Sequence, residues 1–311
     1  RYETAMASAD DAFEAPPTRA DDVTLCYFTS GTTGYPKMVL HTQASFGIGH
    51  IVTGQYWLRL EPGEVMWCIT DTGWAKAAYS AYFGPFIQGA TVFVYGAAFD
   101  PKSALELLCD YPIDVLCGAP TVYRILVQQD LRGFKIEGLK RCYSAGEPLN
   151  PEVITAWRDF TGLSLREGYG QTETCILCAS WEEIEVRPGS MGKASPGDDL
   201  QVVDRDGEVV EAGEEGEIAV RIKPDRPAGL FLEYWKSPER MEESFRGDWY
   251  YTGDRAVRDE DGYFWFLSRS DDVIISSGYR IGPFEVESAL IEHPAVAESA
   301  VVSSPDETRG E

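Results

Sequence analysis

Short apolar runs alternate with amphipathic stretches through the first two thirds of the chain. The apolar runs have the length of strands and occupy residues 23–28, 65–69, 91–94, 114–117 and 141–143. The stretches between them have helical spacing and occupy residues 75–87, 101–109 and 121–129. Because strand–helix alternation requires crossover connections, the pattern predicts a largely parallel sheet in an α/β region over residues 1–197, entered through a polar connector.

A different pattern begins after residue 197. Short runs with strand character lie at residues 201–204, 208–210, 217–222 and 250–266. Turn pairs separate them, namely Asp206-Gly207, Ala212-Gly213 and Asp261-Gly262. Such pairs between apolar runs are typical of hairpins, so residues 198–268 are predicted to form a small antiparallel, β-barrel-like subdomain.

A third region occupies residues 269–311. After a charged stretch, the pattern predicts a strand at residues 273–276, a helix at 283–292 and a strand at 296–303. A unit of about 40 residues is too small to close a core of its own. We therefore expect it to be the start of a small α+β C-terminal domain, and the chain to be a piece of a longer protein.

The composition is that of a folded chain with an acidic surface. Hydrophobic residues make up 44% and charged residues 25% of the 311 positions, as in ordinary globular enzymes. The formal charge of −24 repels phosphate backbones, which argues against nucleic acid as a partner. No apolar run approaches the ~18 residues of a membrane span. If the substrates are anionic small molecules, the few cations must gather at their site.

The seven cysteines are scattered and odd in number, which favours a reducing compartment: the cytoplasm, or the mitochondrial matrix in a eukaryote. Cys175 and Cys178 form a C-x-x-C pair, but no second pair stands at zinc-ligand spacing. Both lie in an apolar stretch. Buried packing is therefore the expected role of this pair.

The strongest chemical signal follows the first apolar run. It is the string Thr29-Ser30-Gly31-Thr32-Thr33-Gly34-Tyr35-Pro36-Lys37. Small hydroxyl residues and glycines leave backbone N–H groups accessible, and Lys37 adds a cation, so the loop can wrap a polyphosphate. It lacks the spacing of a Walker A loop. A Ser/Thr/Gly loop on its own is more often a plain turn.

The whole string, however, resembles the phosphate loop of the adenylate-forming superfamily, which includes acyl-CoA synthetases, luciferases and peptide-synthetase adenylation domains. Four further segments match that family in order: Ala145-Gly146-Glu147-Pro148, Gly168-Tyr169-Gly170-Gln171-Thr172-Glu173, Tyr251-Thr252-Gly253-Asp254, and Arg269-Ser270-Asp271-Asp272 leading into Ser277-Gly278-Tyr279-Arg280. The resemblance implies the adenylate-forming fold. It also implies an enzyme that adenylates a carboxylic acid with ATP and Mg²⁺ and then transfers the acyl group to coenzyme A.

The resemblance also implies a nucleotide site. Adenine would lie against Tyr169, whose flanking glycines let the backbone approach a flat ligand. Thr172 would contact the α-phosphate and Glu173 would hold Mg²⁺. The nucleotide-binding set comprises the loop from Thr29 to Lys37 together with Gly146, Glu147, Glu167, Gly168, Tyr169, Gly170, Gln171, Thr172, Asp254 and Arg269.

Asp254 and Arg269 would hold the ribose in this family, although an isolated Asp in such a place is as often a turn residue. Asp271 stands at the family's hinge, where adjacent carboxylates could equally be a solvated surface. Positions matching the CoA tunnel are Ser277, Gly278 and Tyr279, with Arg309 a candidate for a CoA phosphate. Arg280 matches a residue at the site of the second half-reaction.

The implied chemistry is positioning and charge neutralisation by Lys37, Mg²⁺ and loop amides, with no covalent protein intermediate. The catalytic set is Lys37, Thr172, Glu173 and Arg280. No histidine is required as a base. We expect His50 and His293 to be structural, and the role of His41 stays open.

Gly170 bears on the choice of acid. Relatives that accept only acetate carry a bulky aromatic residue there, so glycine implies a deeper acyl pocket, for which Trp74 is a candidate wall residue or, equally, a core tryptophan. Each buried methylene adds about 0.8 kcal/mol, which favours short- to medium-chain acids over acetate. The segment from residue 271 to 287 resembles medium-chain acyl-CoA synthetases most.

Three alternatives stay open. The first is a benzoate-type CoA ligase. The second is a naturally short, non-catalytic module that binds nucleotide or acyl-adenylate, because the family's longer N-terminal region and its late lysine are not in this sequence. The third is a peptide-synthetase adenylation domain. In each case the partners are small molecules, and a homo-oligomer is compatible with the sequence.

Overall fold

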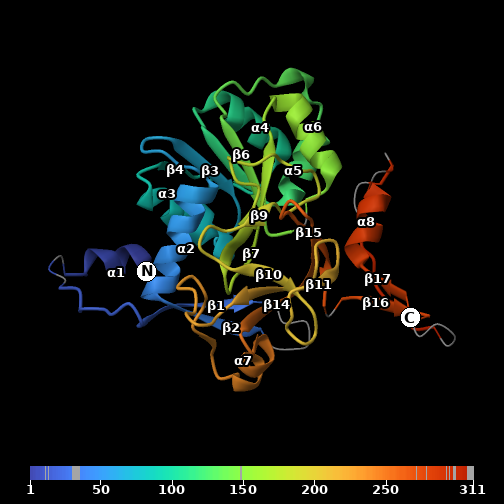
Figure 1. Cartoon of the computed structure of the whole chain (residues 1–311). Helices are drawn as coiled ribbons and strands as arrows, with labels where there is room; N and C mark the ends of the chain where they lie inside the picture. The colour runs from blue at the N-terminus through green and yellow to red at the C-terminus, as the bar shows by residue number, and fades with distance from the viewer. Residues whose placement is uncertain are drawn as a thin grey trace.

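The computed structural model describes residues 1–10, 12, 14–29, 36–147, 149–270, 272–277, 279–291, 293, 295–296 and 299–306. A seven-stranded sheet in the order β4-β3-β5-β6-β7-β8-β9 forms its centre (Figure 1). The first five strands in this order pair in parallel: β4 (Thr91–Phe93), β3 (Val65–Ile69), β5 (Val115–Gly118), β6 (Arg141–Ala145) and β7 (Leu165–Gln171). β8 (Cys175–Ala179) and β9 (Lys193–Ala194) continue it antiparallel. The predicted α/β fold is confirmed.

Helices cover both faces of this sheet. Alternate residues of β5 face opposite sides, with Leu116 in one core and Val115 and Cys117 in the other. The first core is closed by α4 (Pro101–Asp110), α5 (Pro120–Val127) and α6 (Pro151–Thr161). The second is closed by η1 (Val52–Trp57), which continues α2 (Gln43–Ile51), and by η2 (Ala77–Phe83), which runs into α3 (Gly84–Ile87).

A smaller sheet holds the strands on either side of the phosphate loop. β1 (Val23–Thr29) pairs antiparallel with β2 (Lys37–Thr42), which also pairs with β12 (Glu233–Tyr234). The prediction that the first apolar run belongs to the parallel sheet was wrong. A run of apolar residues identifies a strand but carries no information about the sheet that the strand joins. The sequence analysis did not predict β2, α2 or α6.

The predicted antiparallel region is also present. β10 (Leu200–Val203), β11 (Glu215–Arg221), β14 (Trp249–Arg258) and β13 (Phe245–Arg246) form one sheet, with β15 (Phe264–Arg269) paired to β14. In the described part of the chain this sheet stays open instead of closing into a barrel. Residues 208–210 make only one isolated bridge, Val203 to Val209, where a strand was expected.

The last unit consists of the hairpin β16 (Ile274–Ser276) and β17 (Tyr279–Ile281), followed by α8 (Pro283–Ile291). It lies beside the antiparallel sheet (Figure 1), with the Phe284 ring 5.7 Å from that of Phe266 in β15. The helix is confirmed, but residues 299–303 are not a strand, because no described strand lies beside them and Val302 is exposed. Three short helices complete the fold: α1 (Tyr2–Ala7), η3 (Leu131–Gly133) and α7 (Pro238–Ser244). None of the described helices is long and apolar enough to span a membrane.

Candidate nucleotide and acyl site

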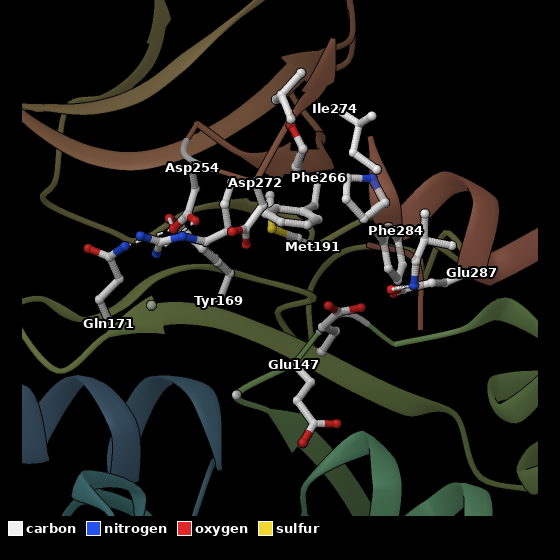
Figure 2. A pocket seen from close by; sticks show the side chains of 18 of the residues that line it. Glu147, Tyr169, Gln171, Met191, Asp254, Phe266, Asp272, Ile274, Phe284 and Glu287 are labelled. Carbon is white, nitrogen blue, oxygen red and sulfur yellow. Dashed lines mark hydrogen bonds and ion pairs between the residues drawn. The ribbon is translucent and has the colours of Figure 1, made fainter. Parts of the chain in front are cut away.

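A hydrogen-bonded network joins β7 to β14 at the centre of the molecule. Tyr169 Oη donates to Asp254 Oδ2 at 2.6 Å, and Gln171 Nε2 donates to the same oxygen at 2.8 Å. Gln171 Nε2 also lies 2.8 Å from the Thr252 carbonyl, and Tyr250 Oη donates to Gln171 Oε1 at 3.0 Å. Figure 2 shows Tyr169, Gln171 and Asp254 of this network close together. Gly168 to Gln171 of the predicted motif therefore lie in strand β7, and Thr172 and Glu173 lie in the turn that follows it.

The charge at the centre of this network is the Asp254 carboxylate. Its Oδ1 lies 3.4 Å from the Arg269 guanidinium, and only 4% of the residue is exposed. Burial, and then the charge of Asp254, raise the pKa of Tyr169 well above its usual value. Tyr169 therefore stays a neutral donor, and the pair brings together two predicted site residues that lie 85 positions apart.

A second cluster forms around Tyr234 in β12. Tyr234 Oη donates to Glu173 Oε1 at 2.8 Å, and the Lys37 ammonium lies 5.4 Å from the centre of the same ring. A cation over an aromatic face is attracted by the ring quadrupole. One buried tyrosine thus holds the predicted phosphate cation and the predicted metal carboxylate near each other. The sequence analysis missed Tyr234, because nothing local to residue 234 marks it as a neighbour of residue 173.

His41, whose role was open, is fully buried at the end of β2. Its Nε2 lies 2.7 Å from the Thr172 carbonyl and its Nδ1 lies 3.1 Å from Ser45 Oγ. Because a carbonyl only accepts, Nε2 carries the proton and Nδ1 accepts from Ser45. Burial lowers the pKa of His41, which favours this neutral form. His41 ties the turn at Thr172 to the strand that begins at Lys37.

Two glycines of the predicted motif are required by close packing. A Cβ at Gly168 would stand 2.6 Å from the Trp57 indole, and one at Gly170 would stand 1.5 Å from the Cys175 carbonyl oxygen. The second distance is impossible without moving β7 away from β8. Close packing of the backbone therefore requires a glycine at position 170, in addition to the deeper acyl pocket that the sequence analysis expects from it.

Two cavities meet at this network. The larger, of about 900 Å³, contains residues from the phosphate-loop ends, the helices α2–η1 and η2, and the β7–β8 turn; among them are Thr29, Lys37, Trp74, Gly146, Gly168, Gly170, Gln171, Thr172, Glu173 and Arg269. Trp74 lines this cavity and is 71% exposed, so it is not a core tryptophan.

The smaller cavity, of about 730 Å³, lies between β7, β15 and the C-terminal unit (Figure 2). Gly146, Glu147, Glu167, Tyr169 and Asp254 line one part of it. Phe266, Ile274 and Phe284 line another. The two cavities share Gly146, Gly168, Gly170, Gln171 and Arg269 of the predicted nucleotide-binding set, so one ligand could extend from one cavity into the other.

Two carboxyl groups flank the expected base position. Glu147 accepts a hydrogen bond from Thr121 Oγ1 at 2.8 Å and lies 4.0 Å from the Arg124 guanidinium. Glu167 is buried, and burial raises the pKa of its carboxyl to about 8. At neutral pH Glu167 is therefore largely a neutral acid, which can donate as well as accept a hydrogen bond.

Several predicted residues cannot be placed. Ser30 to Tyr35, Asp271, Gly278 and Arg309 lie outside the described residues, as does the side chain of Arg280. Pro36 is described and exposed at the start of β2. Ser277, with φ at 52°, and Tyr279, which is 75% exposed, lie in the β16–β17 hairpin away from both cavities. Cys175 and Cys178 are buried, unpaired thiols in β8, as expected.

Comparison with known proteins identifies the family of this chain. The sequence pattern of the family described as AMP-binding enzyme matches residues 2–235, and that of the AMP-binding enzyme C-terminal domain matches residues 285–311. The chain belongs to the AMP-binding enzyme family. This agrees with the resemblance drawn from the five motifs.

Relatives of this family member are similar over nearly its whole length. The human protein named acyl-coenzyme A synthetase ACSM3, mitochondrial, is 54% identical over 307 residues, covering 98% of this chain and 52% of the relative. The anthranilate CoA ligase AuaEII in complex with anthranoyl-AMP superposes with a TM-score of 0.90 at 30% identity, covering 99% of this chain and 59% of that one. ATP-bound MatB from Rhodopseudomonas palustris gives 0.89 at 30% identity, covering 99% and 60%. The chain spans about half the length of the relatives it matches.

Proposed function

We propose that this chain carries the nucleotide and acyl site of an AMP-forming acyl-CoA synthetase, an acid–thiol ligase. The observation that carries the proposal is that the Asp254 network and the Lys37–Tyr234–Glu173 cluster line two adjoining cavities, which share Gln171 and Arg269. A buried carboxylate suited to ribose hydroxyls thus lies in one cavity, and a cation suited to phosphates lies in the other. The family membership and the ACSM-type relative support it.

In this proposal the nucleotide lies across β7. Gly146, Glu147 and Tyr169 flank adenine, with Glu167, Gly168 and Gly170 beside it. Asp254 accepts from the ribose hydroxyls and Arg269 assists. Gln171 Nε2 holds the Asp254 carboxylate in place through the 2.8 Å hydrogen bond to Oδ2. A carboxylate that already accepts two bonds from the protein is pre-oriented for ligand donors.

The phosphates would meet positive charge in the larger of the two cavities. The loop from Thr29 to Lys37 supplies amides and the Lys37 ammonium, and Thr172 contacts the α-phosphate. Glu173 would hold Mg²⁺ together with phosphate oxygens. A single carboxylate fits this ion, because Mg²⁺ usually keeps waters and binds one or two carboxylates beside the substrate phosphates. Bound there, the ion would neutralise charge on the leaving pyrophosphate.

The transfer step would use the C-terminal unit. We assign Asp271 as the hinge, Ser277, Gly278 and Tyr279 as the CoA tunnel, Arg280 as a residue of the second half-reaction, and Arg309 as a contact to a CoA phosphate. The match of residues 285–311 to the family's C-terminal domain supports this assignment. The exposed position of Tyr279 is compatible with a tunnel that assembles only after the unit rotates.

For the acid we propose a short- to medium-chain carboxylate, with Trp74 and Gly170 in the pocket wall. Similarity to the ACSM3 protein supports it and also supports the mitochondrial matrix as location. An aromatic acid is the second candidate. The aromatic lining of the larger cavity, which includes Tyr27, Trp57, Trp74 and Tyr79, favours it, as does the neighbour holding anthranoyl-AMP.

The test is acid-dependent exchange of pyrophosphate into ATP, followed by thioester formation with CoA, for acetate, butyrate, octanoate and benzoate. Exchange should be greatest with butyrate or octanoate, and dependent on Mg²⁺. No exchange with any of the four acids by the full-length protein, together with retained binding of AMP, would support the non-catalytic module instead.

A further inference from the structure

Lys76 is held differently from the other lysines in the described part of the chain. It lines the larger cavity beside Trp74, and its ammonium donates to the carbonyls of Gly118 at 3.0 Å and Ala145 at 2.8 Å. Gly118 and Ala145 are the last residues of β5 and β6, so the lysine joins two neighbouring strands at their carboxyl ends. In open α/β sheets, ligands bind outside the carboxyl ends of the strands. Lys76 therefore stands where a ligand of this fold is expected.

The charge of Lys76 has no carboxylate partner among the described residues. Lysines elsewhere do have one: Lys140 lies 2.9 Å from Asp114, and Lys223 lies 3.0 Å from Asp248. A lysine ammonium has three donors, and the two carbonyls use two of them. One N–H of a half-buried cation is thus left for an acceptor. An anion is the acceptor that also balances the charge.

The Cys117 thiol is another group that responds to this ammonium. Burial by itself raises the pKa of the thiol, but a hydrogen bond with Cys68 and the charge of Lys76 lower it to about 7. Cys117 has no exposed surface and belongs to the core beneath η2, and neither thiol lines a cavity. The thiol therefore lies on the core side of Lys76, whereas a ligand would reach the lysine from the cavity.

The proposed reaction brings two anions together, the phosphates of ATP and the carboxylate of the acid. In a chain of formal charge −24, each of them needs a cation. Among the described residues, the cations that line the larger cavity are Lys37, Lys76 and Arg269. Lys37 ends the proposed phosphate loop, and Arg269 already pairs with the Asp254 carboxylate at 3.4 Å. Lys76 is the cation that remains for the acid.

We infer that Lys76 receives the carboxylate of the acid and holds it for the first half-reaction. This inference rests on the proposed function. In that step one carboxylate oxygen forms a bond to the α-phosphorus, the bond from this phosphorus to the bridging oxygen of pyrophosphate breaks, and pyrophosphate leaves with the electron pair; no proton is transferred. The carboxylate charge is lost as the acyl-adenylate forms, so Lys76 binds the acid more strongly than the product. It should therefore act on the KM for the acid more than on kcat.

The experiment compares Lys76→Met with the wild type in the full-length protein. Pyrophosphate exchange gives kcat and KM for the better substrate of butyrate and octanoate, and calorimetry gives the affinity for the matching non-hydrolysable acyl-adenylate analogue. In Lys76→Met the KM for the acid should rise at least about tenfold, since a hydrogen bond to a charged group contributes about 1.4 kcal/mol or more, which is a factor of ten. The KM for ATP and the affinity for the analogue should stay close to those of the wild type.

Matched variants separate charge from packing. Lys76→Arg keeps a cation, whereas Lys76→Gln keeps a donor but no charge, so the KM for the acid should be lower in Lys76→Arg than in Lys76→Gln. This pair decides the question even if Lys76→Met does not fold. Cys117→Ala removes the thiol and should leave the KM unchanged. Lys102→Met, at an exposed position of α4 outside both cavities, controls for the loss of a lysine.

The results distinguish recognition of the acid from a structural role. Equal losses of affinity for the acid and for the adenylate analogue, or an unchanged KM with a lower melting temperature, would show that Lys76 only ties β5 to β6, and would overturn the inference alone. A KM that rises as much in Cys117→Ala as in Lys76→Met would assign the ammonium to the thiol and would overturn it as well.

Two further results concern the substrate. A KM for adipate below that for hexanoate in the wild type, with the difference lost in Lys76→Met, would place a second carboxylate on Lys76 and would also overturn the inference. No exchange with any acid, including butyrate and octanoate, would overturn the proposed function and the inference with it.

Discussion

The two ends of the cavity system treat buried polar groups in opposite ways. Around Asp254 and Glu173 every named donor has an acceptor: Tyr169, Gln171, Tyr234 and Tyr250 all make bonds of 2.6–3.0 Å. Along the wall formed by Thr53, Trp57 and Tyr79 the polar atoms have no described partner. A partnered network holds one geometry, which suits a substrate that never varies. Along the wall no described hydrogen bond fixes the polar atoms, so packing holds these side chains.

The largest effect should come from removing the Asp254 carboxylate, the charge at the centre of the hydrogen-bonded network. Asp254→Ala removes the acceptor of Tyr169 and Gln171 as well as that of the ribose, and charge-assisted bonds contribute about 1.5–3 kcal/mol each. We expect kcat/KM for ATP to fall at least about 100-fold. Asp159→Ala, at an exposed position of α6, is the control and should change it less than twofold. A small effect of Asp254→Ala would mean that the network is structural only.

The next effect concerns the rigidity of the strand that carries the network. In Gly170→Ala the new methyl group would meet the Cys175 carbonyl at 1.5 Å, so β7 and β8 must separate. We expect the free energy of unfolding to fall by about 3 kcal/mol, measured by denaturant titration. Gly133→Ala, where nothing lies within 4 Å, should be close to neutral. Equal effects of the two would contradict the close approach.

The free energy of unfolding should depend on pH through Glu167. Burial raises the pKa of Glu167 to about 8 from an ordinary value of 4.5. Because the pKa of Glu167 is higher in the folded protein than in the unfolded chain, the free energy of unfolding is highest below pH 4.5. This contribution to stability is lost as the pH rises toward 8. In Glu167→Gln this loss, on the order of 5 kcal/mol, should disappear from the curve of unfolding free energy against pH. An unchanged slope between these pH values would show that Glu167 ionises normally.

The smallest effect should come from removing the hydrogen bond that positions the Glu173 carboxylate. Tyr234→Phe removes the 2.8 Å bond to Glu173 Oε1 and keeps the ring beneath Lys37. We expect a fall in kcat of about tenfold, together with a higher Mg²⁺ concentration for half-maximal rate. Tyr263→Phe loses a comparable 3.0 Å bond to the Glu185 carbonyl, outside both cavities, and should leave the Mg²⁺ dependence unchanged. A matching response of the two variants would place Glu173 away from the metal.

Sequence reasoning was strongest where function requires contiguous residues. The motif from Gly168 to Glu173 and the string from Tyr251 to Asp254 are local, so they were identified directly, and hydrogen bonds from Tyr169 and Gln171 to Asp254 bring them together. The parallel strands β3 to β6 were predicted within one or two residues, because alternation of short apolar runs with helices permits few arrangements.

The sequence by itself thus determined the α/β class and the family, and it supplied the residues proposed for the nucleotide site. Only the tertiary structure decided that β1 pairs with β2 outside the main sheet, that Tyr234 holds Glu173, that His41 holds the Thr172 turn, and that Thr53, Trp57 and Tyr79 share an unsatisfied wall. The Tyr234–Glu173 and His41–Thr172 bonds join residues 61 and 131 positions apart. No local pattern of apolar and polar residues records which distant residues become neighbours, because tertiary packing sets those contacts.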